Sequence, residues 1–208
     1  MPKDVDHEER REELLEAVWR VIARDGLERA TVRVIAKETG WSTGVLAHYF
    51  ADKDEILVSA LRLAYERIAA RWATKLEGLS GIAALQELVL DNLPLDDERE
   101  LETKFLMSYW SRAIREGDGV PRPERRGPQL IDLLSDLVRE AQRDGEIRAD
   151  DDPEDVAERL LALIDGFSLH TLLDPQRLTR ERQVELVERE FQRLRPTNTT
   201  TKQRKTNA

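Results

Sequence analysis

Apolar side chains recur every three or four residues along almost the entire chain, and no segment shows the two-residue alternation of a β-strand. This spacing gathers apolar side chains on one face of a helix. Glycines, prolines and N-capping residues divide the pattern into nine predicted helices. They cover about residues 8–24, 32–38, 43–49, 53–78, 80–92, 97–115, 127–143, 153–172 and 180–194. The sequence therefore predicts an all-α fold, a nine-helix bundle.

The composition fits a globular protein without thiol chemistry. The 208 residues, 40% of them hydrophobic and 36% charged, suffice for one or two domains with a buried core. The chain has no cysteine, which excludes disulfides, cysteine nucleophiles and thiolate metal sites. No apolar run approaches the roughly 20 residues of a membrane span, and the charged residues 1–13 lack the apolar stretch of a signal peptide. We expect a cytoplasmic protein that does not enter a membrane.

Residues 31–53 have the spacing of a helix-turn-helix. Two short predicted helices flank a tight turn at Thr39-Gly40-Trp41. Ala36 supplies the small side chain that a close helix crossing needs, and Gly40 supplies the turn. Apolar anchors follow at Ile35, Trp41, Leu46 and Tyr49. An ordinary helical hairpin would also fit this spacing.

The distribution of charge qualifies this interpretation. The net charge is −9, and residues 1–55 hold nine Lys and Arg against thirteen Asp and Glu. Residues 33–53, however, hold three basic and two acidic side chains. Local charge matters more than the total for nucleic-acid binding. We therefore expect modest non-specific affinity for DNA, with specificity from a few contacts.

One stretch resembles the signature of TetR-family regulators. Its most telling parts are Ser42-x-Gly44-x-Leu46-x-His48-Tyr49-Phe50 and Lys53-Asp54-Glu55-x-Leu57, and the resemblance covers about residues 8–60. It implies a three-helix DNA-binding domain in residues 1–53 and a helical ligand-binding and dimerisation domain in residues 54–195. Residues 196–208 have no large apolar side chain, which predicts a disordered basic tail.

The C-terminal half is more loosely similar to the choline/betaine-repressor branch of that family. The features are Trp110 and Ala113, the run Gln142-x-x-Gly145-Glu146-Ile147, and Leu163-Ile164-Asp165-Gly166-Phe167.

The resemblance implies DNA contacts on the predicted helix 43–49 and beside it. The candidate DNA-binding residues are Thr31, Arg33, Ser42, Thr43, Gly44, Val45, His48, Tyr49 and Lys53. Thr31, His48, Tyr49 and Lys53 would meet phosphates, and Arg33 could bind a guanine edge with two hydrogen bonds. Thr43, Val45 and Ala47 stand where lysine, threonine and tyrosine are frequent in the family. Val45 either meets thymine methyl groups or serves packing.

The resemblance also implies a homodimer formed by the eighth and ninth helices. Two apolar stripes there are the candidate interface: Leu160, Leu163, Ile164, Phe167, Val184, Val187, Phe191 and Leu194. A monomer would leave some of this surface exposed unless the stripes pack within their own subunit.

Large side chains on the central helices are the candidate ligand site. They are Tyr65, Trp72, Phe105, Tyr109, Trp110, Asp165, Phe167 and His170, with Met107 near them. Each aromatic side chain could equally belong to the core. Tryptophan and tyrosine rings with Asp165 could bind a quaternary ammonium through cation–π contact, and a flat hydrophobic effector would suit the same residues.

No catalytic signature is present. The sequence lacks a G-x-S-x-G motif, a P-loop, a dinucleotide fingerprint and His with carboxylates at metal-ligand spacing. We therefore expect no enzyme, cofactor or metal. The prediction is a ligand-responsive transcriptional regulator, a repressor, that binds a palindromic operator as a homodimer and is released by an unknown small molecule. A helical adaptor that holds a protein partner, or a DNA-binding regulator without a small-molecule effector, would use the same helices.

Overall fold

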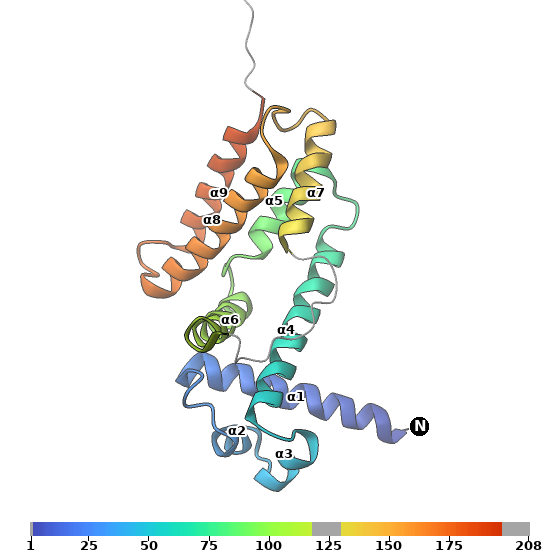
Figure 1. Cartoon of the computed structure of the whole chain (residues 1–208), viewed down its shortest axis with the longest axis vertical. Helices are drawn as coiled ribbons and strands as arrows, with labels where there is room; N and C mark the ends of the chain where they lie inside the picture. Colours follow the sequence, from blue (N-terminus) through green and yellow to red (C-terminus); the bar gives the residue numbers. More distant parts are fainter. Residues whose placement is uncertain (1, 118–129, 197–208) are drawn as a thin grey trace, which may run out of the picture.

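The computed structural model describes residues 2–117 and 130–196, with side chains from residue 10 onward. These residues form nine α-helices and no strand, which confirms the predicted fold (Figure 1). The helices are α1 (Pro2–Asp25), α2 (Val32–Thr39), α3 (Thr43–Tyr49), α4 (Lys53–Lys75), α5 (Gly81–Asp91), α6 (Asp97–Glu116), α7 (Leu130–Arg143), α8 (Pro153–Leu173) and α9 (Arg180–Leu194).

Two helix ends differ from the prediction. The first helix begins at Pro2 rather than near residue 8, because charged residues are acceptable helix formers that apolar periodicity does not detect. The fourth ends at Lys75, three residues before the predicted end at Gly78. The predicted start of the seventh helix and, apart from Pro196, the predicted disordered tail lie outside the described residues.

Short polar side chains fix where the helices begin. Thr31 Oγ1 accepts the Val34 N–H, and Ser42 Oγ accepts the Val45 N–H. Asp52 Oδ1 accepts the Glu55 N–H at 2.8 Å, and Glu55 reaches back to the Ala51 N–H at 2.7 Å. Each such cap contributes about 1 kcal/mol and satisfies amides that have no partner inside the helix. The caps therefore define the starts of α2, α3 and α4.

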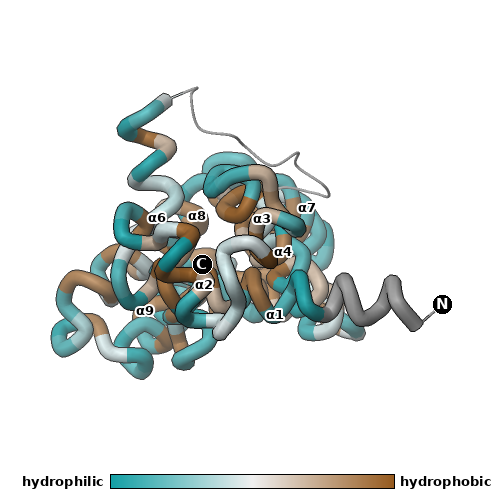
Figure 2. The backbone as a smooth tube through the Cα atoms, turned by 90° about the horizontal axis from the view of Figure 1, so that it is seen from below, coloured by the Kyte–Doolittle hydropathy of each residue, from teal (hydrophilic) through white to brown (hydrophobic). Residues whose placement is uncertain are grey.

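The buried side chains form two clusters at opposite ends of the molecule. One cluster joins α1 to the short helices α2 and α3 and to the first half of α4, and it includes Phe105 and Tyr109 of α6. Figure 2, seen from the α2–α3 end, shows hydrophobic segments between these helices and hydrophilic ones outside. The second cluster joins α5, α7, α8 and α9. Helix α4 contributes to both clusters, through the residues of its first half and through Trp72 near its end, so it connects them (Figure 1).

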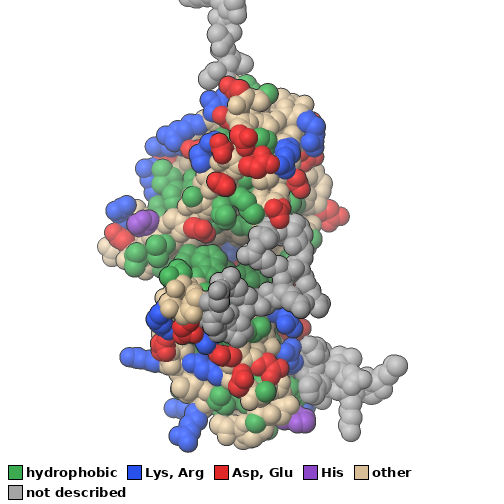
Figure 3. All heavy atoms as spheres, viewed as in Figure 1, with side chains coloured by type: hydrophobic (Ala, Val, Ile, Leu, Met, Phe, Trp, Pro, Cys, Tyr) green, Lys and Arg blue, Asp and Glu red, His purple; other side chains and the backbone are tan. Residues whose placement is uncertain are grey.

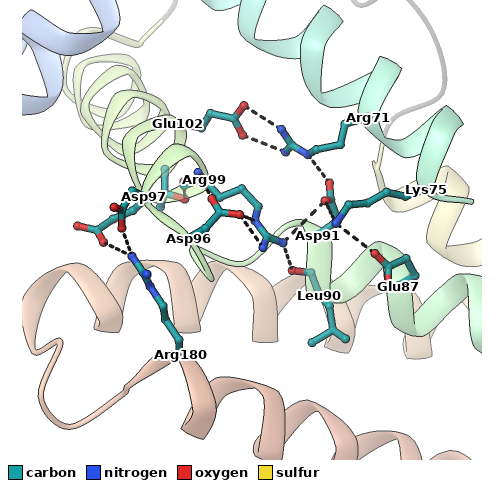
Figure 4. A network of polar contacts seen from close by, with 12 residues as sticks. Arg71, Lys75, Glu87, Leu90, Asp91, Asp96, Asp97, Arg99, Glu102 and Arg180 are labelled. Atoms are coloured by element: carbon teal, nitrogen blue, oxygen red, sulfur yellow. Dashed lines mark hydrogen bonds and ion pairs between the residues drawn. The ribbon is translucent and has the colours of Figure 1, made fainter.

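A buried charge network holds α4, α5 and α6 together (Figure 4). Arg71 of α4 donates to Asp91 Oδ2 of α5 at 2.8 Å and makes two hydrogen bonds of 2.9 Å with Glu102 of α6. Lys75 adds an ion pair with Asp91 at 2.9 Å. Burial alone lowers the pKa of Arg71, but its hydrogen bonds to Glu102 and Asp91 raise it overall. Since Asp91 and Glu102 are 1% and 5% exposed, these carboxylates depend on their cations.

Replacing Arg71 by methionine should destabilise the fold by about 3 kcal/mol, because Glu102 would then be buried beside no cation. Urea unfolding measures this loss. The matched control is Arg189→Met, which removes an exposed pair with Glu185 and should change stability by less than about 1 kcal/mol. Equal stability of the two variants would contradict the role given to Arg71.

Candidate nucleic-acid interface and ligand site

The α2–α3 unit has the geometry of a helix-turn-helix. Ala36 and Leu46 are 5% and 1% exposed, so the two helices bury their facing sides. Gly40 ends α2 with φ at 73°, a left-handed conformation that side chains disfavour, and its N–H is bonded to Ala36 O. Trp41 and Tyr49 close the unit with their ring centroids 5.5 Å apart. These contacts hold α3 in a fixed orientation.

The outer face of α3 is largely exposed. Ser42, Thr43, Gly44, Val45 and His48 are exposed, and Tyr49 is half-buried. Val45 is 41% exposed, so it does not serve the core, and its methyl groups are available to a ligand. Six of the nine candidate DNA-binding residues thus lie on one short helix and its cap.

The other three candidates flank this face. Arg33 is exposed at the start of α2 and makes no hydrogen bond or ion pair with the described residues. Thr31 caps α2. Lys53 makes a hydrogen bond within the chain: its Nζ donates to Leu27 O at 3.1 Å and links the start of α4 to the α1–α2 connection. A phosphate contact by Lys53 would have to share this bond.

Two arginines of α6 form ion pairs with residues of the first 55 positions, and no motif or spacing in the sequence indicates these pairs. Arg112 donates to Asp54 Oδ1 at 2.7 Å and to Glu116 Oε2 at 2.8 Å. Arg115 pairs with Glu28 in the α1–α2 connection. The hydrogen bonds to Asp54 raise the pKa of Arg112 and lower that of the Asp54 carboxyl. A groove of about 500 Å³ runs beside these pairs, and Met107 of α6 and Leu172 of α8 help to line it.

The candidate ligand residues do not form one group. Phe105 and Tyr109 are 0% and 4% exposed, and the Phe105 ring lies 5.9 Å from that of Trp19. Both therefore belong to the core in this conformation and offer no surface to a ligand. Tyr65 and His170 are at the other extreme, exposed on the surfaces of α4 and α8.

Four candidates for the ligand site are half-buried. Trp72 and Phe167 pack against the second cluster, and Trp110 packs against the first. Trp72 Nε1 is buried without a hydrogen-bond acceptor. Burial raises the pKa of Asp165, whose carboxylate has no hydrogen bond or ion pair with the described residues. Unsatisfied polar groups of this kind are typical of ligand sites.

Most of the candidate interface residues are buried within the single chain. Five of them are between 0% and 4% exposed and pack in the second cluster: Leu160, Ile164, Val187, Phe191 and Leu194. Within the single chain, the side chains of these five residues pack in the same cluster as residues of α5 and α7. Leu163, Phe167 and Val184 are half-buried.

A different stripe of α8 faces outward. It consists of Ala162, Gly166, Leu169 and Leu173, spaced four, three and four residues apart on one side of the helix. Leu169 and Leu173 are 45% and 69% exposed.

Comparison with known proteins identifies the family. Residues 14–60 match the family described as bacterial regulatory proteins, tetR family, and residues 81–196 match the C-terminal family of BetI-type transcriptional repressors. The chain belongs to the TetR family. The resemblance predicted from residues 42–57, and that of the C-terminal half to the choline/betaine branch, are confirmed.

Individual relatives span nearly the whole of this TetR-family chain. It is 37% identical over 190 residues to the HTH-type transcriptional regulator PksA of Bacillus subtilis, covering 88% of each chain. It is 30% identical over 185 residues to the regulator BetI of Vibrio campbellii, covering 88% of this chain and 90% of that one. A solved putative transcriptional regulator from Saccharomonospora viridis in complex with choline is 25% identical, with a TM-score of 0.77 over 89% of this chain and 96% of that one.

The TetR-family protein is therefore a transcriptional regulator with a DNA-binding domain, and not an enzyme. Among the described residues, no helix is long and apolar enough to cross a membrane. Within the same residues, no three His, Asp or Glu side chains come together as a metal site would require.

Replacing Asp165 by asparagine should raise the thermal stability of this regulator at neutral pH. A carboxyl whose pKa is raised in the folded state binds its proton more tightly there than when unfolded, so its contribution to stability falls as the pH rises. The gain from Asp165→Asn should disappear in acid, where both states are protonated. Thermal unfolding across pH measures it, with exposed Asp150→Asn as the control. A loss of stability at neutral pH would show that the carboxylate has a partner.

Proposed function

We propose that this regulator is a repressor that binds a near-palindromic operator as a homodimer and is released by a small-molecule effector. The observation that carries the proposal is the outer face of α3. Thr43, Gly44 and Val45 are exposed on a helix that Leu46 and the Gly40 turn hold in place, and they are not part of the core. A surface that is fixed but unused within the fold suits recognition of a partner.

The proposed DNA contacts follow from which groups this face presents. Thr43 offers a hydroxyl and Val45 two methyl groups, which suit base edges and thymine methyl groups in the major groove. Arg33 is placed to bind a guanine edge. Ser42, Gly44 and the candidate phosphate ligands Thr31, His48, Tyr49 and Lys53 surround these positions. Such contacts to phosphates position a protein, whereas the base contacts select a sequence.

The proposed dimer uses the outward stripe of α8 in place of the buried stripes. Leu169 and Leu173 expose much of their side chains, and the neighbouring Ala162 and Gly166 would let a second helix approach closely. Two-fold symmetry would place the two α3 helices in successive major grooves, about 34–36 Å apart. A regulator that acts this way works in the cytoplasm, where the DNA lies.

The proposed effector is an organic cation. Asp165 is half-buried and makes no ion pair with the described residues, and Trp72 of α4 and Phe167 of α8 are half-buried aromatic side chains that pack against the same cluster. Aromatic faces with a carboxylate suit a quaternary ammonium. The solved relative from Saccharomonospora viridis holds choline, which supports this chemistry.

The effector would act through α4 and α6. Arg71 joins the second half of α4 to α6, and Arg112 joins α6 to the start of α4. An effector that binds one arrangement of these helices more tightly raises the population of that arrangement. The size of this shift is limited by the difference between its affinities for the two arrangements. We place the boundary between the DNA-binding domain and the ligand-binding domain at residue 53, the first residue of α4 and the neighbour of Asp54, which pairs with Arg112.

Selection from a random duplex pool should return an inverted repeat whose half-sites are about 10 base pairs apart. Val45→Ala should keep this spacing and the stability of the fold, but change the preferred base at one position in each half-site. Sequencing of the selected pools and thermal unfolding measure these effects. A pool without a preferred site would overturn the operator proposal and favour the helical adaptor.

Leu169→Asp combined with Leu173→Asp should convert the dimer to a monomer without loss of helix. The added carboxylates would be buried in the interface but exposed in the monomer. Sedimentation velocity gives the mass, and circular dichroism gives the helix content. The control is Leu79→Asp, since Leu79 is 43% exposed in the α4–α5 connection. A double variant that remains dimeric would place the interface elsewhere.

A further inference from the structure

The DNA-binding end of the molecule carries more acidic than basic residues, yet its acids are all engaged. Residues 25–55 hold six acidic and four basic side chains. Arg24 pairs with both Asp25 and Glu38. Asp52 and Glu55 accept backbone N–H groups at the start of α4.

The two remaining acids are paired with α6. Arg115 pairs with Glu28, and Arg112 pairs with Asp54 at 2.7 Å. Arginines from outside the segment, one on α1 and two on α6, therefore offset four of its six carboxylates. In the folded chain, most of the negative charge of residues 25–55 is therefore compensated by arginines from outside the segment.

Three of the four basic side chains are left without such a partner. Lys53 donates to Leu27 O, but Arg29, Arg33 and Lys37 make no hydrogen bond or ion pair with the described residues. Arg29 does add to the lowering of the pKa of Asp25, after the hydrogen bond from Arg24 that is its main cause. All three side chains are exposed.

These three side chains lie on α2 and in the connection just before it. Arg33 and Lys37 are one turn apart and share its outward side, opposite the buried Ile35 and Ala36. Arg29 precedes the helix in the α1–α2 connection. Basic side chains project from the α2 end of the surface in Figure 3. We refer to Arg29, Arg33 and Lys37 as the α2 basic strip.

We propose that Arg29 and Lys37, the outer two residues of the strip, bind backbone phosphates of DNA and supply sequence-independent affinity, while Arg33 between them in sequence contacts a base. The inference rests on DNA binding through α3. The recognition helix itself carries no Lys or Arg, and phosphate neutralisation by Lys and Arg provides most non-specific affinity. The strip is the group of unpaired cations nearest in sequence to that helix.

The test measures how binding depends on salt for the full-length protein. Fluorescence anisotropy on a selected duplex and on a random-sequence duplex, from about 50 to 200 mM salt, gives the slope of log K against log salt. Each lost phosphate contact should reduce the slope by about 0.9, hence by about 1.8 in a symmetric dimer. Arg29→Ala and Lys37→Ala should each show this reduction on both duplexes and leave the preference between them unchanged.

Two further variants make the test selective. Arg143→Ala removes the same charge from an exposed, unpaired position on α7, far along the chain, and should leave the slope unchanged. Arg33→Ala should instead weaken the preference for the selected duplex. If the slopes of Arg29→Ala and Lys37→Ala match that of Arg143→Ala, the proposed phosphate contacts of Arg29 and Lys37 are wrong, although the protein still binds DNA. A wild-type protein that binds neither duplex would overturn the proposed function together with it.

Discussion

The packing around Trp19 is the contact on which the arrangement of the DNA-binding end depends. Trp19 of α1 is 5% exposed, its Nε1 donates to Ala60 O of α4 at 3.0 Å, and its ring lies against Phe105 of α6. The Arg67 guanidinium also lies over the ring, 5.2 Å from its centroid. One buried indole therefore fixes three helices that are far apart in sequence. A helix of the C-terminal half, α6, is part of the core beneath the proposed DNA-reading surface.

This shared core explains how the two halves could respond to each other. The junction has a tightly packed apolar centre, and tightly packed cores shift between discrete arrangements more readily than they deform. Charged pairs at its rim, Arg112 with Asp54 and Arg115 with Glu28, link the end of α6 to the parts that hold α2 and α3 in place. A displacement of α6 would alter both the position of α4 and the charge near the α2 basic strip.

The sequence predicted local features well because their causes lie within a few residues. Helix starts depend on single caps such as Ser42 and Asp52, and the turn depends on Gly40. Contacts between residues far apart in sequence were harder to predict. Periodicity shows that α8 has apolar stripes but not which of them faces the core. Leu160 and Ile164 are buried, whereas the equally large Leu169 and Leu173 are exposed. Phe105 and the pairs of Arg112 and Arg115 join residues more than 50 positions apart, which spacing does not reveal.

The central claim is that the outer face of α3 contacts DNA bases, while Arg29 and Lys37 of the α2 basic strip bind phosphates of the DNA backbone. A crystal structure of the full chain with a selected duplex tests it most directly. The account predicts α3 in the major groove with Val45 against base edges, and the side chains of Arg29 and Lys37 within hydrogen-bond distance of phosphates. A complex in which α3 faces solvent, or in which DNA lies against another part of the molecule, would contradict it.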